Sequence, residues 1–275
     1  MLPILGTEAI ASGALTRSAL RWNYTALLPD VYQLKDARRD LYSNAVAAWL
    51  WTKRKGIIAG RAAAALHGVS WIEDSAQVEI IAEHGRRQPG VVVREERIGD
   101  DEISTIGELL VTTPARTALD LGRHLARDAA VAHLDALAGL TGVTRPDIAI
   151  LEERYRGARG MPAARAAIAL MDGGARSPRE TALRLLLIDA GLPRPSTAIS
   201  LSDDLWEATI GMGWEQPKVG VDCEESRSGR NAAQDVACHD MLQRLGWYHI
   251  RVPPRQPQAV TISRVRRALR LRGWR

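Results

Sequence analysis

The last hundred residues of the chain constrain its fold most strongly, because their pattern changes repeatedly between helical and strand periodicity. Helical patterns and strand-like stretches follow one another in this order: helix 180–190, strands 198–201, 206–212 and 218–224, helix 235–245, strand 247–252 and helix 262–271. Alternation of this kind predicts an α/β domain, in which helices cover a sheet. A Gly173-Gly174 break before this segment predicts a domain boundary, so residues 175–275 are expected to form a domain of their own.

The first forty residues predict a small helical module that ends in a β element. A helical stretch from Thr7 ends at Gly13, and Thr16 caps a second one. Pro29-Asp30 then predicts a turn before a short strand. Helix, glycine turn, helix and β element is the order of a winged helix-turn-helix.

Together with the run Asp30-Val31-Tyr32-Gln33-Leu34, this order resembles the N-terminal domain of AbiEi-type antitoxins and related actinobacterial regulators. The resemblance implies a DNA-binding module at residues 1–70. Strand-like stretches at 78–81, 91–94 and 109–112 then predict a mixed α/β middle region at residues 71–174. The expected fold class is therefore α+β or α/β.

Basic residues recur where DNA contacts are expected. Arg17 and Arg21 lie four residues apart, hence on one helical face. From Arg244 to Arg275 the chain has nine arginines and no acidic residue. The residues expected to contact DNA are Arg17, Arg21, Lys53, Arg54, Lys55, Arg61, Arg264, Arg267 and Arg270. Solvated helix faces, or cations at helix C-termini, explain the same pattern without DNA.

Three acidic residues in the last hundred, Glu180, Asp222 and Glu224, lie at defined positions of a predicted helix and a predicted strand. Glu180 follows Ser177 in an S-x-x-E capping box, which gives it a structural role as well. Asp222 and Glu224 alternate on one predicted strand, so both carboxylates are expected on one face. The strand before it contains Ile210-Gly211-Met212-Gly213-Trp214.

These motifs resemble the PD-(D/E)XK nuclease superfamily and, within it, domains similar to the very-short-patch repair endonuclease. The fold that this resemblance implies is a central mixed sheet flanked by helices. The resemblance implies catalytic roles for Glu180, Asp222 and Glu224, with Mg²⁺ held by Asp222 and Glu224. It also implies an acid where Gly211 stands, and a downstream histidine where Ser226-Arg227-Ser228 stand. Because Mg²⁺ requires closely placed oxygen ligands, these departures indicate a degenerate site and no cofactor.

The expected function is therefore DNA binding without cleavage, by a transcriptional regulator or an antitoxin-like factor. A metal-dependent DNA endonuclease and a protein-interaction scaffold remain alternatives. The expected partners are double-stranded DNA and a toxin or other protein, in keeping with a net charge of +5. Without a long apolar segment or an N-terminal leader, and with two isolated cysteines, a cytoplasmic protein without membrane contact is expected.

Overall fold

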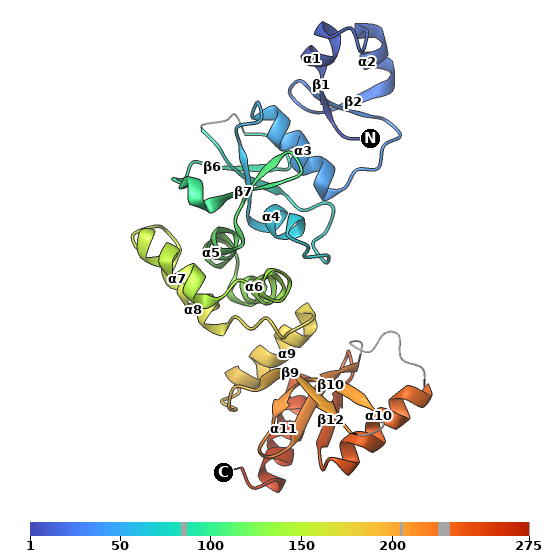
Figure 1. Cartoon of the computed structure of the whole chain (residues 1–275), viewed down its shortest axis with the longest axis vertical. Helices are drawn as coiled ribbons and strands as arrows, with labels where there is room; N and C mark the ends of the chain where they lie inside the picture. Colours follow the sequence, from blue (N-terminus) through green and yellow to red (C-terminus); the bar gives the residue numbers. More distant parts are fainter. Residues whose placement is uncertain (84–86, 204–205, 225–231, 275) are drawn as a thin grey trace. The chain divides into compact units, whose positions relative to one another are not determined.

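The computed structural model describes residues 1–83, 87–203, 206–224 and 232–274 (Figure 1). It has helices and three β-sheets, which confirms the expected mixed α/β class. The chain divides into two compact units. The first unit comprises Met1–Leu125 and Leu140–Ala169, and the second comprises Ala126–Gly139 and Leu170–Arg275.

The first unit contains two sheets and the helices that pack on them. Its elements in chain order are β1 (Ile4–Leu5), α1 (Gly6–Ala11), α2 (Arg17–Asn23), β2 (Tyr24–Leu28), β3 (Val31–Leu34), α3 (Leu41–Trp51), β4 (Ile57–Ala59), α4 (Gly60–Leu66), β5 (Val78–Ile81), β6 (Val91–Arg94), a 3₁₀ turn (Asp100–Glu102), β7 (Ile103–Ile106), β8 (Leu109–Thr112), α5 (Pro114–His124), α7 (Arg145–Arg154) and α8 (Met161–Leu170).

The N-terminal sheet has the strand order β1-β3-β2. Along the chain, α1 and α2 lie between β1 and β2. Thr16 caps α2, as its Oγ1 accepts the N–H of Ala19. Gly13 separates the two helices with a φ of +74°, in the left-handed region that favours glycine. Asp30 at the β2–β3 turn accepts the N–H of Thr7 at 2.9 Å, which fastens the hairpin to the start of α1.

The larger sheet of the first unit has the strand order β6-β5-β4-β8-β7. Its apolar core includes the fully buried Ile58, Ile80 and Val111, and α3 packs against it. Strand β4 pairs with β5 and with β8, so this sheet extends to both sides of residue 70, where the expected boundary lies.

The second unit contains one four-stranded sheet with helices on both faces (Figure 1). Its elements are α6 (Arg127–Thr141, up to Gly139), α9 (Pro178–Asp189), β9 (Ser196–Ser202), β10 (Glu207–Trp214), β11 (Val219–Cys223), α10 (Ala232–Arg244), β12 (Tyr248–Val252) and α11 (Gln258–Leu271). The strand order is β12-β11-β10-β9, in which only the β11–β12 pair is parallel.

Two apolar clusters hold this sheet. Side chains of α9 and α11, such as Leu187 and Leu269, pack against β10, β11 and β12. On the other face Met241 of α10 packs against Ile210. Both cysteines are free thiols buried in these clusters. No helix in the described part of the chain combines the length and the apolar composition that crossing a bilayer requires.

Candidate site around Gly211

Glu180 is placed by the start of helix α9. Ser177 caps this helix, because its Oγ accepts the N–H of Glu180 at 3.2 Å. The Glu180 side chain turns back and accepts the N–H of Arg176 at 2.7 Å, one residue before the cap. Glu180 is 2% exposed, so its second carboxylate oxygen lies inside the unit.

Gly211 lies on β10 beside the two carboxylates that the sequence singled out. A Cβ atom at Gly211 would lie 2.8 Å from Asp222 Oδ1 and 3.3 Å from Glu180 Oε1. Strands β10 and β11 are antiparallel, with Met212 opposite Val221. The next residues along the two strands, Gly211 and Asp222, therefore also lie opposite each other. The structure therefore brings Glu180, Gly211 and Asp222 together.

Asp222 is buried and both of its oxygens have partners. Its Oδ1 accepts the Gly211 N–H at 2.5 Å, and its Oδ2 lies 2.6 Å from His249 Nε2. The exposed fractions of the His249 and Asp222 side chains are 3% and 5%. A carboxylate shared between a backbone N–H and an imidazole is held in a fixed position.

His249 was not found by sequence reasoning. It lies on β12 opposite Gly220, which has no side chain to separate it from the neighbouring strand. Its contact with Asp222 spans 27 residues and depends on the parallel pairing of β11 with β12. The available signal was the alternation in β12: because Tyr248 and Ile250 share one face of the strand, His249 between them lies on the opposite face.

Glu224 does not join this group. It is exposed and directly follows the end of β11 at Cys223. Among the described residues, Glu180, Asp222 and Glu224 do not bring one ligand atom each within 4.8 Å of one another. The expected substitution of the downstream histidine at Ser226-Arg227-Ser228 lies outside the described residues.

The basic residues expected to bind DNA in the first unit differ in their surroundings. Arg17 and Arg21 are exposed on α2, next to Trp22, which is 69% exposed. Lys53, Arg54 and Lys55 are exposed after the end of α3. The guanidinium of Arg54, however, makes two hydrogen bonds of 2.6 Å to the carboxylate of Glu8. Arg61 is half-buried, with its Nε 4.0 Å from Glu79 Oε1.

The arginines of α11 are exposed at Arg264, Arg267 and Arg270. Arg264 donates to the Arg251 carbonyl at 3.2 Å and to Gln256 Oε1 at 2.7 Å. Arg267 and Arg270 line a surface hollow with Ile262 and Leu271. This surface of α11 therefore places these two arginine side chains beside apolar side chains.

A second charged cluster, which the sequence did not indicate, is centred on Arg116 of α5. Its fully buried guanidinium lies 3.0 Å from Asp120, 2.7 Å from Glu102 and 3.1 Å from Glu96. The spacing of Arg116 and Asp120 at i and i+4 was the available local signal.

This cluster does not fit a metal ion. Glu96, Asp120 and His124 bring ligand atoms within 4.8 Å of one another. The carboxylates of Asp120 and Glu96, however, accept hydrogen bonds from Arg116 and Arg123. A divalent cation placed there would lie against two guanidinium groups, so the cluster is an ion-pair network.

Glu96 makes the stability of this network depend on pH. Burial raises the pKa of Glu96, but His124 and Arg123 outweigh it and lower the pKa from 4.5 to about 2. Because the folded-state pKa is the lower one, the Glu96 carboxylate stabilises the fold above about pH 4.5, and this contribution is lost as the pH falls toward about 2.

We therefore expect Glu96→Gln to be less stable than the native chain at neutral pH, with a difference that shrinks as the pH falls below about 4.5. Urea unfolding followed over this pH range measures the difference. Glu153→Gln is the control, because the Glu153 side chain is 75% exposed. A difference that stays constant down to acidic pH would contradict the role assigned to Glu96.

Together, the two units define a mixed α/β protein with a strand–helix–turn–helix–hairpin module and a buried Asp–His pair beside Gly211. No protein-family model matches the chain. The chain is 30% identical over 192 residues to the uncharacterized proteins MT2308 and Rv2248 of Mycobacterium tuberculosis (strains CDC 1551 / Oshkosh and ATCC 25618 / H37Rv). These matches cover 67% of this chain and 69% of each relative. The chain belongs to the family of these mycobacterial proteins.

Proposed function

We propose that the chain is a DNA-binding protein, a transcriptional regulator or antitoxin-like factor, whose nuclease-like second unit binds DNA without cutting it. The observation that carries the proposal is the exposed face of α2, where Arg17 and Arg21 lie on the second helix of a helix-turn-helix arrangement. A cytoplasmic location and a protein partner such as a toxin belong to the same proposal.

The geometry of the N-terminal module supports a winged helix. In such modules the second helix enters the major groove, and the following hairpin lies beside the backbone. Here α2 is followed directly by the β2–β3 hairpin, and β1 pairs with β3 at the other side of the small sheet. Neither Arg17 nor Arg21 has a hydrogen-bonded or ion-paired partner among the described residues, so both guanidinium groups can reach phosphates.

The surroundings of Gly211 support the absence of cleavage. A PD-(D/E)XK enzyme needs a carboxylate at this position, and here Asp222 Oδ1 occupies the space while bonded to the Gly211 N–H. Phosphodiester hydrolysis by such a site requires a metal to activate water and to stabilise charge on the phosphate. With Glu224 exposed and Asp222 bonded to His249, this ligand set is incomplete.

The double variant Arg17→Ala/Arg21→Ala tests the DNA-binding surface. We expect weaker binding to a labelled random-sequence duplex, measured by fluorescence anisotropy between 50 and 200 mM salt. We also expect the slope of log K against log salt to decrease by about 1 for each phosphate that the variant no longer neutralises, hence by about 2. The matched control is Arg38→Ala/Arg156→Ala, which removes two charges from side chains that are 82% and 77% exposed.

Equal losses in the two double variants would show that net charge, and not α2, determines the affinity. No binding by the native chain over this salt range would contradict the proposal. Nicking of supercoiled plasmid by the native chain with Mg²⁺ or Mn²⁺ would instead favour the endonuclease that uses Glu180, Asp222 and Glu224.

A further inference from the structure

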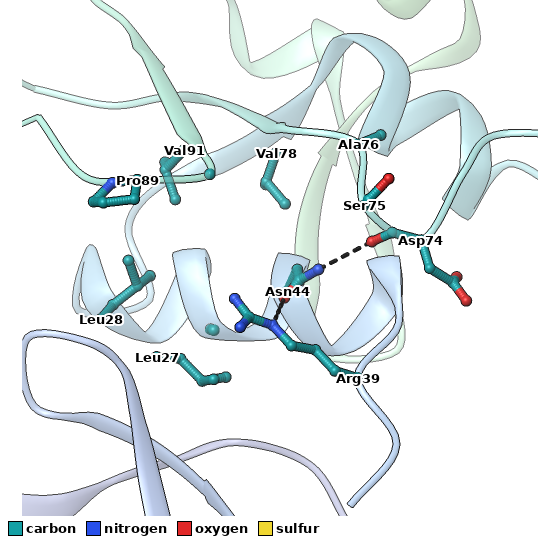
Figure 2. Close-up of a pocket in the computed structure, with 12 residues that line it drawn as sticks. Leu27, Leu28, Arg39, Asn44, Asp74, Ser75, Ala76, Val78, Pro89 and Val91 are labelled. Carbon is teal, nitrogen blue, oxygen red and sulfur yellow. Dashed lines mark hydrogen bonds between the residues drawn. The ribbon is translucent and has the colours of Figure 1, made fainter.

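A pocket of about 450 Å³ lies in the first unit, beside the end of the hairpin strand β2. It is lined by residues from β2, α3, β5 and β6 and from the segments that precede α3, β5 and β6. Figure 2 shows Arg39, Asn44 and Asp74 gathered at one end of this pocket, and Leu28 and Val91 at the other. The pocket therefore has a polar end and an apolar end, which is the composition of a small-molecule site.

Arg39 is held in place at the polar end by a neutral partner. Its Nε donates to Asn44 Oδ1 at 3.0 Å, and Asn44 Nδ2 donates to the carbonyl of Asp74 at 3.2 Å (Figure 2). In the described part of the chain, the two terminal nitrogens of Arg39 have no hydrogen-bond partner and no carboxylate within 4.0 Å. A guanidinium with both terminal nitrogens available can bind a carboxylate through two parallel hydrogen bonds.

The acidic residue at this end does not cancel the charge of Arg39. Asp74 Oδ2 lies 3.2 Å from Arg38 Nη2, and Asp74 Oδ1 accepts the N–H of Leu41 at 3.4 Å. Arg38 thus balances the charge of Asp74, and Arg39 gives this end a positive charge. An anionic group is favoured there over a neutral one or a cation.

The other end accepts an apolar body. Leu28 and Val78 are 7% and 1% exposed, and they line the pocket with Leu27, Ala47 and the partly exposed Val91. These are aliphatic side chains, so a hydrocarbon group placed against them leaves water without breaking a hydrogen bond.

We propose that this pocket binds a small carboxylate with an apolar body, such as a medium-chain or aromatic acid, whose carboxylate pairs with Arg39. Leu27 and Leu28 belong to the hairpin that follows α2. A ligand in the pocket therefore contacts the hairpin that directly follows α2, the proposed DNA-binding helix. We further propose that this ligand is an effector, which changes the affinity of the chain for DNA. This role of the ligand rests on the proposed function.

Octanoate is the probe, and isothermal titration in the absence of DNA is the measurement. We expect saturable binding to the native chain and a dissociation constant at least about tenfold higher in Arg39→Gln, because that variant cannot form the charge-assisted pair. Val91→Phe, which fills the apolar end, is also expected to weaken binding. Arg156→Gln is the matched control and should bind like the native chain. Octan-1-ol, which lacks the charge, should bind more weakly than octanoate.

No saturable binding by the native chain, or equal affinity in Arg39→Gln and the native chain, would overturn the proposal. DNA affinity measured without octanoate separates this result from the proposed function. If the chain binds octanoate but not DNA, the site stands and the proposed function fails. If it binds DNA but not octanoate, only the site fails. If it binds both, octanoate is expected to shift the DNA dissociation constant severalfold in the native chain and not in Arg39→Gln.

Discussion

Arg116→Met is expected to lower the free energy of unfolding of the chain by about 3–5 kcal/mol, because it leaves buried carboxylates without their cation. Arg116 is fully buried and bonds to Asp120, Glu102 and Glu96. The guanidinium also lies over the ring of Tyr155, 4.9 Å from its centroid. Burial lowers the pKa of Arg116, but the neighbouring carboxylates raise it above its usual value, so the side chain stays charged.

Urea unfolding followed by circular dichroism measures this effect. Arg156→Met is the control, and it should change the free energy by less than about 0.5 kcal/mol, because Arg156 is exposed. Adding Asp120→Asn to Arg116→Met should recover part of the missing stability, since it removes one of the unpaired charges. A loss of stability in Arg116→Met no larger than in the control would show that the network contributes little.

Gly211→Asp is expected to make the stability of the second unit depend on divalent cations. The new Cβ would lie 2.8 Å from Asp222 Oδ1, so the Asp222 side chain must move and its bond to the Gly211 N–H weakens. The new carboxylate would also approach Glu180, which is 2% exposed. Three carboxylates placed together repel one another unless a cation lies between them.

Gly211→Asn is the matched control, because it has the shape of Asp without the charge. In the presence of EDTA we expect Gly211→Asp to be less stable than Gly211→Asn by about 1–3 kcal/mol. Mg²⁺ or Mn²⁺ should recover most of this difference and leave the native chain and Gly211→Asn unchanged. Thermal unfolding with and without the cation measures the effect. An equal response of both variants to the cation would mean that Glu180 and Asp222 do not face residue 211.

The local pattern of the chain was sufficient for most of its secondary structure. The expected strands at 78–81, 91–94 and 109–112 coincide with β5, β6 and β8. Helix start signals such as Thr16 and Ser177 lie where the structure has N-caps. These features depend on residues within one or two turns of each other, and short-range hydrogen bonds and periodicity determine them.

Short strands without alternation were missed. Strand β4 has three residues, Ile57–Ala59, all of them buried, so it shows no period of two. It is a strand because β5 and β8 pair with it on its two sides. Strand pairing between distant segments leaves no mark in such a short run of apolar residues.

The sequence by itself singled out Glu180, Gly211 and Asp222, and the tertiary structure added His249 to this group and left Glu224 outside it. Capping residues and periodicity placed Glu180 at a helix start, and alternation placed Asp222 on a strand, because both are local properties. That Asp222 pairs with His249, and that Arg54 pairs with Glu8 46 residues away, follows from strand register and helix packing. The same holds for the pocket at Arg39, where residues from β2, α3, β5 and β6 meet. Contacts of this kind depend on the burial of whole elements against one another, which the spacing of residues along the chain does not encode.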